Sequence, residues 1–432
     1  MPDYRQKRIL VSWYADPRYI PPFVLSDRQV TVGTKSFPDQ PAMMFAAFTP
    51  PGPHDLKAAV DAARIEGPFD AVVVWADASG LNLPLNLDAF NCPKVLCVGD
   101  TQHLKAPLKT MIGYAREARY DFIVSSHNRQ HLHWFAEAGF AKTAWLPGLK
   151  VRHTPRPFNT SRKPVIAFVG NATEYHARRT RLLEALARAG VPVHATRAPR
   201  EASADIFASS LASFNASLNG DLNLRVFEIL SSGGCLFTDR LSLESGLSLL
   251  LEESKEFIGY DAIEECVAQA RFLLRYPKLA LDIAQAGRRA FTERMLPEQR
   301  ANQLLSWVFA EHLDELFRAP CPNRGEADAP FAMRLHVYET LQELHRVVEE
   351  PKILFWNGLS EAYVRDALDL KRLKIFAGSF NNQPVCWNTM AVRKRCTPVE
   401  RAQLEATHWD CILAPKGAPP PASIRSRHAL AV

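Results

Sequence analysis

The alternation of short apolar runs with amphipathic helical stretches is the feature that most constrains how this chain can fold. In its first third, these runs and helical stretches cover residues 8–13, 56–65, 71–75, 94–98, 121–124 and 130–138. Parallel strands need a long crossover connection, which a helix supplies, so the alternation is typical of parallel α/β sheets. It excludes all-β and all-α folds.

A second series of the same kind begins at residue 164, after a polar, proline-containing segment at 153–164. Its expected strands and helices cover residues 164–170, 178–189, 235–238, 263–274, 280–294 and 299–316. The last three are helices that we expect to close this unit. We interpret Trp145–Gly148 as the crossing into the linker and not as a site.

The remaining part of the chain has shorter runs, with strands expected at 352–356, 372–376 and 410–413. The polar run at 378–383 is either a loop or a contact surface. From Ala418 onward the sequence is proline-rich and basic, which predicts a frayed tail. We therefore predict an α/β protein with three parts. Two facing Rossmann-like domains cover residues 1–152 and 153–325, and a small C-terminal α/β module covers residues 326–432.

Composition limits the classes of function. The 432 residues, 47% of them hydrophobic, are enough for more than one core. The net charge of +6 is spread along the chain, whereas nucleic-acid-binding proteins usually collect basic residues in one stripe. No apolar run approaches the roughly 20 residues that cross a bilayer, and no signal peptide is evident. We expect a soluble, cytoplasmic protein without a nucleic-acid partner, and peripheral membrane contact is left open.

The densest group of polar side chains in a helical context lies at 219–234. A helix starting near Asp221 would place Asp221, Arg225 and Glu228 on one face. The start of a helix favours a diphosphate, Glu228 can accept both hydroxyls of a ribose, and Arg225 can offset phosphate charge. Further polar candidates around this helix and the next strand are Asn215, Asn219, Asn223 and Asp239. The alternative is that Arg225 and Glu228 form an ordinary surface pair.

A glycine follows the first strand of the second series directly. At Gly170-Asn171 the backbone can approach a ligand closely, although a plain strand-to-helix turn is the alternative. His176 and Arg179 lie at the basic start of the next helix, where they either contact phosphate or are simply solvated. Neither GxGxxG nor a Walker A motif occurs, which argues against a Rossmann dehydrogenase and a P-loop enzyme.

These motifs together resemble a known donor site. The run Asn223-x-Arg-x-Phe-Glu228, followed by Ile-Leu-Ser-Ser-Gly-Gly-Cys-Leu-Phe-Thr-Asp239, resembles the signature of CgeB-like (spore-maturation type) glycosyltransferases of the GT-B superfamily. Phe168-Val-Gly-Asn171 and His176-x-Arg-Arg179 extend the similarity, which covers roughly residues 60 to 310. Many relatives carry a second glutamate where this chain has Gly220, with Asp221 beside it, so recognition of the sugar does not carry over.

The resemblance implies transfer of a sugar from a nucleoside diphosphate sugar to an acceptor, which is a glycan, a protein or a small molecule. It implies that Glu228 contacts the nucleotide ribose and that Gly170-Asn171 and Arg225 lie near the diphosphate. No cofactor besides the sugar nucleotide is expected. Two rivals remain open: a sugar-nucleotide epimerase of the same fold, and a non-catalytic protein that binds a nucleotide sugar or a glycan.

The first domain is expected to supply the acceptor side, because ligands of parallel sheets gather at the carboxyl ends of the strands. Asp77, Asp100, His103 and His127 follow such ends. Asp100 and His103 are the preferred catalytic pair, since an acceptor hydroxyl must be held and, in an inverting reaction, deprotonated. Asp77 and His127 would line the acceptor side. The alternative for Asp100 is that it caps the next helix.

No metal site is expected. The eight cysteines show neither a CxxC motif nor a spacing suited to zinc, and Cys97 and Cys235 lie inside apolar runs, which is typical of core thiols. No acidic pair ends a strand. Helix dipoles and basic side chains would then neutralise the leaving diphosphate.

Overall fold

The computed structural model describes most of the chain. The described residues are 4–16, 20–35, 45–151, 155–173, 176–319, 329–348, 350–356, 360–367, 370, 373–378, 396–417 and 419–432. The predicted polar run at 378–383 therefore lies outside the described residues, apart from Gly378 at the end of a strand. No helix among those described is long and apolar enough to cross a membrane.

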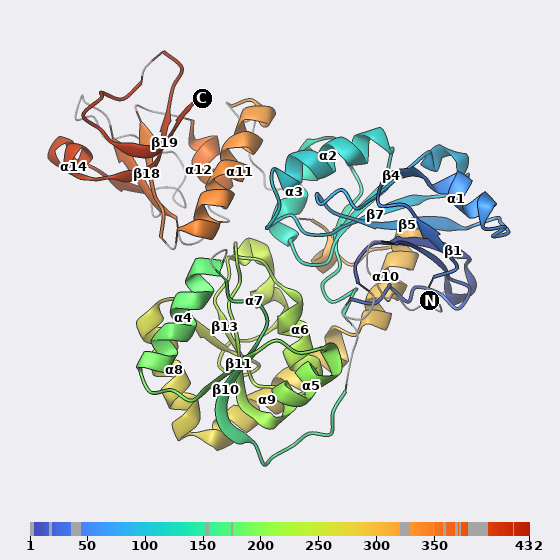
Figure 1. Ribbon diagram of the computed structural model, residues 1–432, viewed down its shortest axis with the longest axis horizontal. Coiled ribbons are helices and arrows are strands. Elements are labelled where there is room, and N and C mark those ends of the chain that lie inside the picture. Colours follow the sequence, from blue (N-terminus) through green and yellow to red (C-terminus); the bar gives the residue numbers. More distant parts are fainter. Residues whose placement is uncertain are drawn as a thin grey trace. The chain divides into compact units, whose positions relative to one another are not determined.

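The first sheet has seven parallel strands in the order β3-β2-β1-β5-β7-β8-β9. Figure 1 labels β1, β5 and β7 of this sheet. The strands are β1 (Ile9–Trp13), β2 (Val30–Thr34), β3 (Ala47–Thr49), β5 (Ala71–Ala76), β7 (Lys94–Val98), β8 (Phe122–Ser125) and β9 (Thr143–Trp145). The connecting helices are α1 (Leu56–Ala62), α2 (Pro107–Glu117) and α3 (Leu132–Glu137). A separate parallel pair joins β4 (Gly52–Asp55) to β6 (Asn82–Leu85). Every residue of β1 and β5 is buried, as expected for interior parallel strands.

The second sheet has five parallel strands in the order β11-β10-β12-β13-β14. They are β10 (Lys163–Val169), β11 (Val193–Thr196), β12 (Ser210–Asn215), β13 (Leu236–Asp239) and β14 (Ile258–Tyr260). Its helices are α4 (Ala177–Arg188), α5 (Arg200–Ser209), α6 (Leu224–Ser231), α7 (Leu247–Leu250), α8 (Ile263–Arg275) and α9 (Pro277–Arg294). Cys97 and Cys235 lie in the cores of the first and second sheets, as predicted.

Both strand orders define a point where the chain reverses its direction across the sheet. In the first sheet this switch point lies between β1 and β5, and in the second it lies between β10 and β12. Ligands of open α/β sheets bind in the crevice outside the carboxyl ends of the strands at such a point. The predicted α/β fold with two Rossmann-like sheets is confirmed, and its topology singles out the residues after β10 and β12.

The C-terminal part forms a third parallel sheet, in the order β17-β16-β15-β18-β19. Its elements are α11 (Phe331–Val347), β15 (Lys352–Trp356), α12 (Glu361–Ala367), β16 (Lys374–Gly378), β17 (Cys396–Pro398), α14 (Arg401–Ala406), β18 (Trp409–Ala414) and β19 (Ser426–Ala431). The prediction of a frayed tail from Ala418 onward is wrong, because β19 pairs with β18 along its length and so satisfies its backbone groups.

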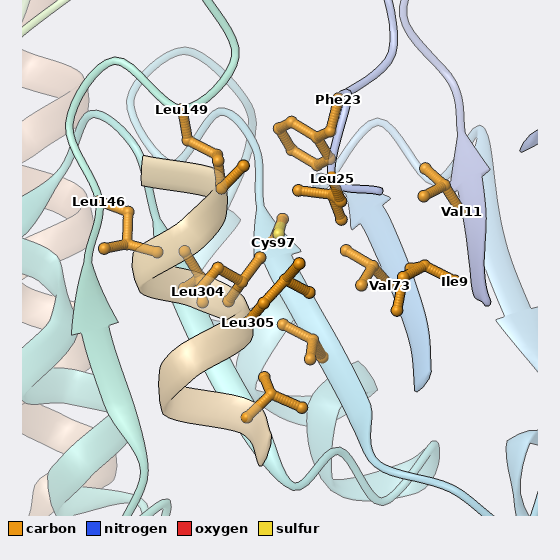
Figure 2. Packing of buried hydrophobic residues seen from close by; sticks show 14 of the residues in the cluster. Ile9, Val11, Phe23, Leu25, Val73, Cys97, Leu146, Leu149, Leu304 and Leu305 are labelled. Carbon is orange, nitrogen blue, oxygen red and sulfur yellow. The ribbon is translucent and has the colours of Figure 1, made fainter. Parts of the chain in front are cut away.

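Helix α10 (Pro297–Ala310) packs differently from the prediction. The helix expected at 299–316 ends earlier, and its apolar face joins the core of the first sheet instead of closing the second. Figure 2 shows Leu304 and Leu305 beside Val73 and Cys97 in one buried cluster. An amphipathic pattern specifies that a face is buried, but it does not specify which sheet buries it.

Contacts divide the chain into two compact units. The first unit is Met1–Asn171, Arg181–Ser217 and Asp221–Cys321, and it includes both large sheets. The second is Ala172–Thr180, Leu218–Gly220 and Pro322–Val432. The third sheet and two short segments from the middle of the chain, one of which includes the start of α4, therefore belong to the second unit.

We expect Gly246→Ala to destabilise the first unit strongly. Gly246 has φ +86°, and a Cβ there would lie 2.4 Å from the ring of the fully buried Trp145. Overpacking combined with backbone strain should lower the free energy of unfolding by about 2–4 kcal/mol. Gly80→Ala is the matched control, since Gly80 has φ +72° but its nearest neighbour would be 3.9 Å away. Urea unfolding compares the two, and equal losses would contradict the packing argument.

Candidate functional site

Helix α6 begins later than predicted. Its first residue is Leu224 and Asn223 is its N-cap in an extended conformation, so Asp221 precedes the helix. The predicted face shared by Asp221, Arg225 and Glu228 is therefore wrong. Gly220, with φ +78°, interrupts any helical path before this point. Asn223 is half-buried, and its side chain makes no capping hydrogen bond.

Arg225 connects the two strands at the switch point. Its Nε donates to the Val169 carbonyl at 2.7 Å, and its Nη1 donates to Asn215 Oδ1 at 2.9 Å. The guanidinium also lies over the Phe168 ring, 4.7 Å from the centroid. The side chain of Arg225 therefore lies at the carboxyl ends of β10 and β12, and it is not half of an ordinary surface pair with Glu228.

Gly170 leaves the space that Arg225 needs. It has φ +151°, and a Cβ at this position would lie 2.2 Å from Arg225 Nη2. The sequence predicted that Gly170 and Arg225 serve one site, and the structure brings them into contact. The glycine after β10 thus allows a guanidinium to lie directly against the backbone.

Glu228 lies one turn further along α6 and is half-buried. Burial raises the pKa of its carboxyl, while the positive charges of Arg225, Lys150 and Arg200 oppose that rise. Burying this carboxylate costs folding free energy, which the three cations offset only in part. This is the arrangement expected of a group that accepts hydrogen bonds from a ligand.

Asn215 and Asp239 are buried and fix the backbone around the site. Asn215 Nδ2 donates to Thr238 Oγ1 at 2.9 Å, which joins β12 to β13. Asp239 accepts from the Ser217 backbone N at 2.9 Å and from Ser217 Oγ at 2.6 Å. Both side chains therefore position the segment between β12 and α6. The sequence predicted only that they belong to the donor site.

The remaining predicted donor residues are placed separately. Asn171 is exposed, and Asp221 is buried. His176, Arg179 and Asn219 belong to the second compact unit. There, His176 Nδ1 lies 3.0 Å from Thr173 Oγ1, Arg179 is buried, and Asn219 Oδ1 lies 2.8 Å from His345 Nδ1.

In the first sheet, Asp100 and His103 form the expected pair. Asp100 Oδ1 accepts from the backbone N atoms of Gln102 and His103 at 2.7 and 3.1 Å, and Asp100 Oδ2 contacts His103 Nδ1. Burial raises the pKa of Asp100, but the hydrogen bonds and charge of His103 and the two amides outweigh burial and lower it to about 2. Asp100 therefore caps the turn after β7 and also orients the His103 ring.

Asp77 and His127 lie near the same edge. Asp77 follows β5 and accepts from the Ser79 backbone N at 2.9 Å. Burial and the charge of Asp100 raise its pKa, against Ser79 and Lys150. Burial and the charge of Lys150 lower the pKa of His127 well below its usual value, so the imidazole is neutral. Tyr14, which sequence reasoning missed, follows β1 at the switch point, where burial and the charge of Asp77 raise its pKa.

Lys150 is the main residue that sequence reasoning missed. Residues 145–151 are all buried, so this segment is no exposed crossing, and Lys150 itself is 6% exposed. Its Nζ lies 3.8 Å from the centroid of the Trp75 ring. Burial lowers the pKa of Lys150 to about 7, opposed by Asp100, Asp77, Cys97 and Glu228. A lysine between two buried apolar residues, Leu149 and Val151, was the signal in the sequence.

We expect Gly170→Ala to weaken nucleotide binding. The methyl group would displace Arg225 from the switch point and add backbone strain of about 1–3 kcal/mol. The affinity for a nucleoside diphosphate should fall roughly 10-fold or more, since a charge-assisted contact is lost. Gly190→Ala is the control, because Gly190 has φ +72° with no atom within 4 Å of a Cβ. Isothermal titration calorimetry measures both, and wild-type affinity in Gly170→Ala would refute the assignment.

The fold and site define a class of protein. Each of two α/β domains has a parallel sheet with polar groups at the carboxyl ends of its strands. In the second sheet, the Arg225 guanidinium bonds to both strands that flank the switch point. This is the predicted α/β architecture with two Rossmann-like sheets. Residues 162–306 match a family model described as "Glycosyl transferase-like", and this segment includes Gly170, Arg225 and Glu228. For that part of the chain, the match agrees with the predicted class, a glycosyltransferase.

No curated protein matches the chain in sequence. Among solved structures, TarM from S. aureus is 11% identical at a TM-score of 0.42, and the match covers 55% of this chain and 54% of TarM. HepE from Anabaena, solved with UDP and glucose, is 11% identical at 0.44, with 69% and 98% covered. Sucrose-phosphate synthase from Thermosynechococcus elongatus is 11% identical at 0.46, with 71% and 100% covered. The matched part thus spans about half the length of TarM.

Proposed function

We propose that this protein is a glycosyltransferase of the CgeB-like type, which moves a sugar from a nucleoside diphosphate sugar to an acceptor. One observation carries the proposal. Gly170, Asn215 and Arg225 meet at the switch point of the second sheet, inside the segment that matches the family model. Ligands of α/β sheets bind at this point, and a guanidinium suits a diphosphate.

The donor would be held by side chains of different character. Glu228 accepts the two ribose hydroxyls, and its raised pKa reflects the desolvation that a bound ribose would compensate with hydrogen bonds. Arg225 presents its guanidinium beside Gly170, where it offsets the charge of the diphosphate. Charge that develops on the leaving group is stabilised by this fixed cation, and no metal ion is required.

The acceptor side would use the pair at the edge of the first sheet. Asp100 is ionised and contacts His103 Nδ1, which leaves Nε2 as the atom that takes the proton of the acceptor hydroxyl. Asp77 and the neutral His127 lie near the same edge and would orient the acceptor. This assignment treats Asp100 as a positioning group and His103 as the base.

The test measures turnover with a panel of sugar nucleotides. UDP-, GDP- and dTDP-sugars are incubated with the protein, and the nucleoside diphosphate released is quantified with and without added glycan acceptors and with EDTA. We expect slow hydrolysis of one donor that acceptor accelerates and EDTA leaves unchanged. Conversion of a donor into a stereoisomer without acceptor would identify an epimerase. Binding of a donor without release or conversion would identify a non-catalytic binding protein.

A further inference from the structure

We propose that Lys150 provides the contact of the first domain to the diphosphate of the donor. The inference rests on the proposed function, since it assigns one more group to the same ligand. Lys150 itself lies outside the matched segment, residues 162–306. The group that Lys150 would bind is the doubly charged diphosphate of the donor, bound next to the switch point of the second sheet.

The ammonium of Lys150 is buried, and the described residues supply it with no hydrogen-bond acceptor. The residue is 6% exposed, and its Nζ lies over the Trp75 ring at 3.8 Å from the centroid. Across the described ranges, Lys150 makes no hydrogen bond and no ion pair with another residue. An ammonium has three donors, and leaving them unmet at this burial is costly unless a ligand supplies acceptors.

The segment that carries Lys150 is fixed in place. Arg300 Nε donates to the Pro147 carbonyl at 2.9 Å, and the Val151 backbone N donates to the Gly148 carbonyl at 3.0 Å. Gly148 has φ +84°, and a Cβ there would lie 3.6 Å from the ring of Phe227. Phe227 stands on α6 between Arg225 and Glu228, so the segment of Lys150 packs against the helix that carries the donor site.

The charges around Lys150 favour an anion as its partner. The titratable groups that act on it are Asp77, Asp100, Cys97, His127 and Glu228. Asp100 is in contact with His103, and burial raises the pKa values of Asp77, Glu228 and Cys97. The neutral His127 adds no charge. Phosphate oxygens would supply the missing acceptors, and lysine is a common point charge for phosphate.

A bound phosphate should also be coupled to protonation. Burial lowers the pKa of Lys150 to about 7 without ligand, so the amine is partly neutral at physiological pH. A dianion favours the ammonium, and binding therefore takes up a proton. We expect the contribution of Lys150 to affinity to be full below pH 7 and to decline as the pH rises above it.

The experiment is titration calorimetry with inorganic pyrophosphate, UDP and GDP at pH 6 and pH 8.5. Lys150→Met is expected to weaken pyrophosphate, and whichever nucleotide binds, about 10- to 100-fold at pH 6 and less at pH 8.5. Lys142→Met is the matched control. Lys142 also lies over an aromatic ring, 4.6 Å from the Phe122 centroid, but its side chain is 42% exposed and pairs with Glu311 at 2.7 Å.

Each outcome decides between distinct conclusions. Equal affinities in wild type and Lys150→Met overturn the inference and leave the proposed function intact. If Lys150→Met weakens pyrophosphate binding but leaves UDP or GDP binding unchanged, the inference is also overturned. Lys150 would then bind a phosphate that is not the diphosphate of the donor, such as one on the acceptor. Binding of neither nucleotide, nor of dTDP, to the wild type would instead count against the proposed function. Loss of UDP binding together with pyrophosphate binding supports the inference.

A folding control keeps the variant interpretable. The pKa of Lys150 lies below the value of 10.5 that an exposed lysine has, so its buried charge costs stability in full below about pH 7. That cost disappears as the pH approaches 10.5. Lys150→Met should therefore melt at a higher temperature than wild type at pH 6 and by a smaller margin at pH 9. A variant that is more stable yet binds phosphate less well is expected for a ligand-binding residue and not for a structural one.

Discussion

Glu228→Gln is expected to lower the affinity for the nucleoside diphosphate about 10- to 100-fold, because the ribose hydroxyls lose a charged acceptor. The side chain keeps its size and its place on α6, so packing is preserved. The change should appear in calorimetric titrations with the nucleotide that stabilises the wild type. Release of nucleoside diphosphate from the sugar nucleotide should fall in parallel.

Although its affinity should fall, Glu228→Gln should be more stable toward unfolding than the wild type at neutral pH. Burial raises the pKa of Glu228 above its value of 4.5 in an unfolded chain. The protonated form therefore favours folding below that value, and the advantage is lost as the pH rises through the folded pKa. At neutral pH the carboxylate is a cost to folding, which glutamine removes. Glu264→Gln is the control, since Glu264 is exposed in the first turn of α8. A clear drop in melting temperature for Glu228→Gln would point to a structural role.

Arg334→Ala is expected to lower the free energy of unfolding of the C-terminal module by about 3–5 kcal/mol. Arg334 of α11 donates from Nε and Nη2 to the two carboxylate oxygens of Asp366 in α12, both at 2.8 Å. The two side chains are 3% and 2% exposed. Removing the guanidinium leaves the Asp366 carboxylate buried without its cation, and the penalty of that desolvation dominates.

Urea unfolding followed by tryptophan fluorescence includes the signal of this module, whose core contains Trp356 and Trp409. Lys57→Ala provides the comparison, because Lys57 and Asp61 form an exposed ion pair, which should contribute about 0–1 kcal/mol. The double variant Arg334→Met, Asp366→Leu should recover most of the loss, since it removes both charges. A loss below about 1 kcal/mol in Arg334→Ala would show that the pair is not desolvated.

The fold was largely predictable because its central strands are continuous apolar runs. Residues 71–75 and 94–98 have few alternatives to an interior parallel strand, and β5 and β7 follow them closely. The strands that sequence reasoning missed are short or polar, such as β11, with the sequence Val-His-Ala-Thr. Strands of this kind are specified by their neighbours and not by their own residues.

The start of α6 was misplaced for a local reason. Asn219, Asp221 and Asn223 are all suitable N-caps, and sequence preference cannot rank them. The tertiary contacts of Arg225 with Val169 and Asn215 fix the helix at Leu224. The grouping of Gly170 with Arg225 could be predicted, because both lie in motifs that contribute to the same donor-site resemblance.

Lys150 and the C-terminal strand depend on long-range packing. A lysine is rarely buried. The burial of Lys150 depends on Trp75 and Phe227, which are distant in sequence, and on the backbone conformation of Gly148. Proline content predicted a frayed end, whereas β19 is fixed by its pairing with β18. Neither outcome is encoded in local periodicity.

The measurement that tests the central claim most directly is a crystal structure of the protein with the nucleoside diphosphate that stabilises it most. We expect the phosphates at the carboxyl ends of β10 and β12, beside Gly170 and Arg225, with the ribose hydroxyls on Glu228. A nucleotide bound anywhere else, with the contacts of Arg225 to Val169 and Asn215 unchanged, would contradict this assignment and leave Arg225 as a structural residue.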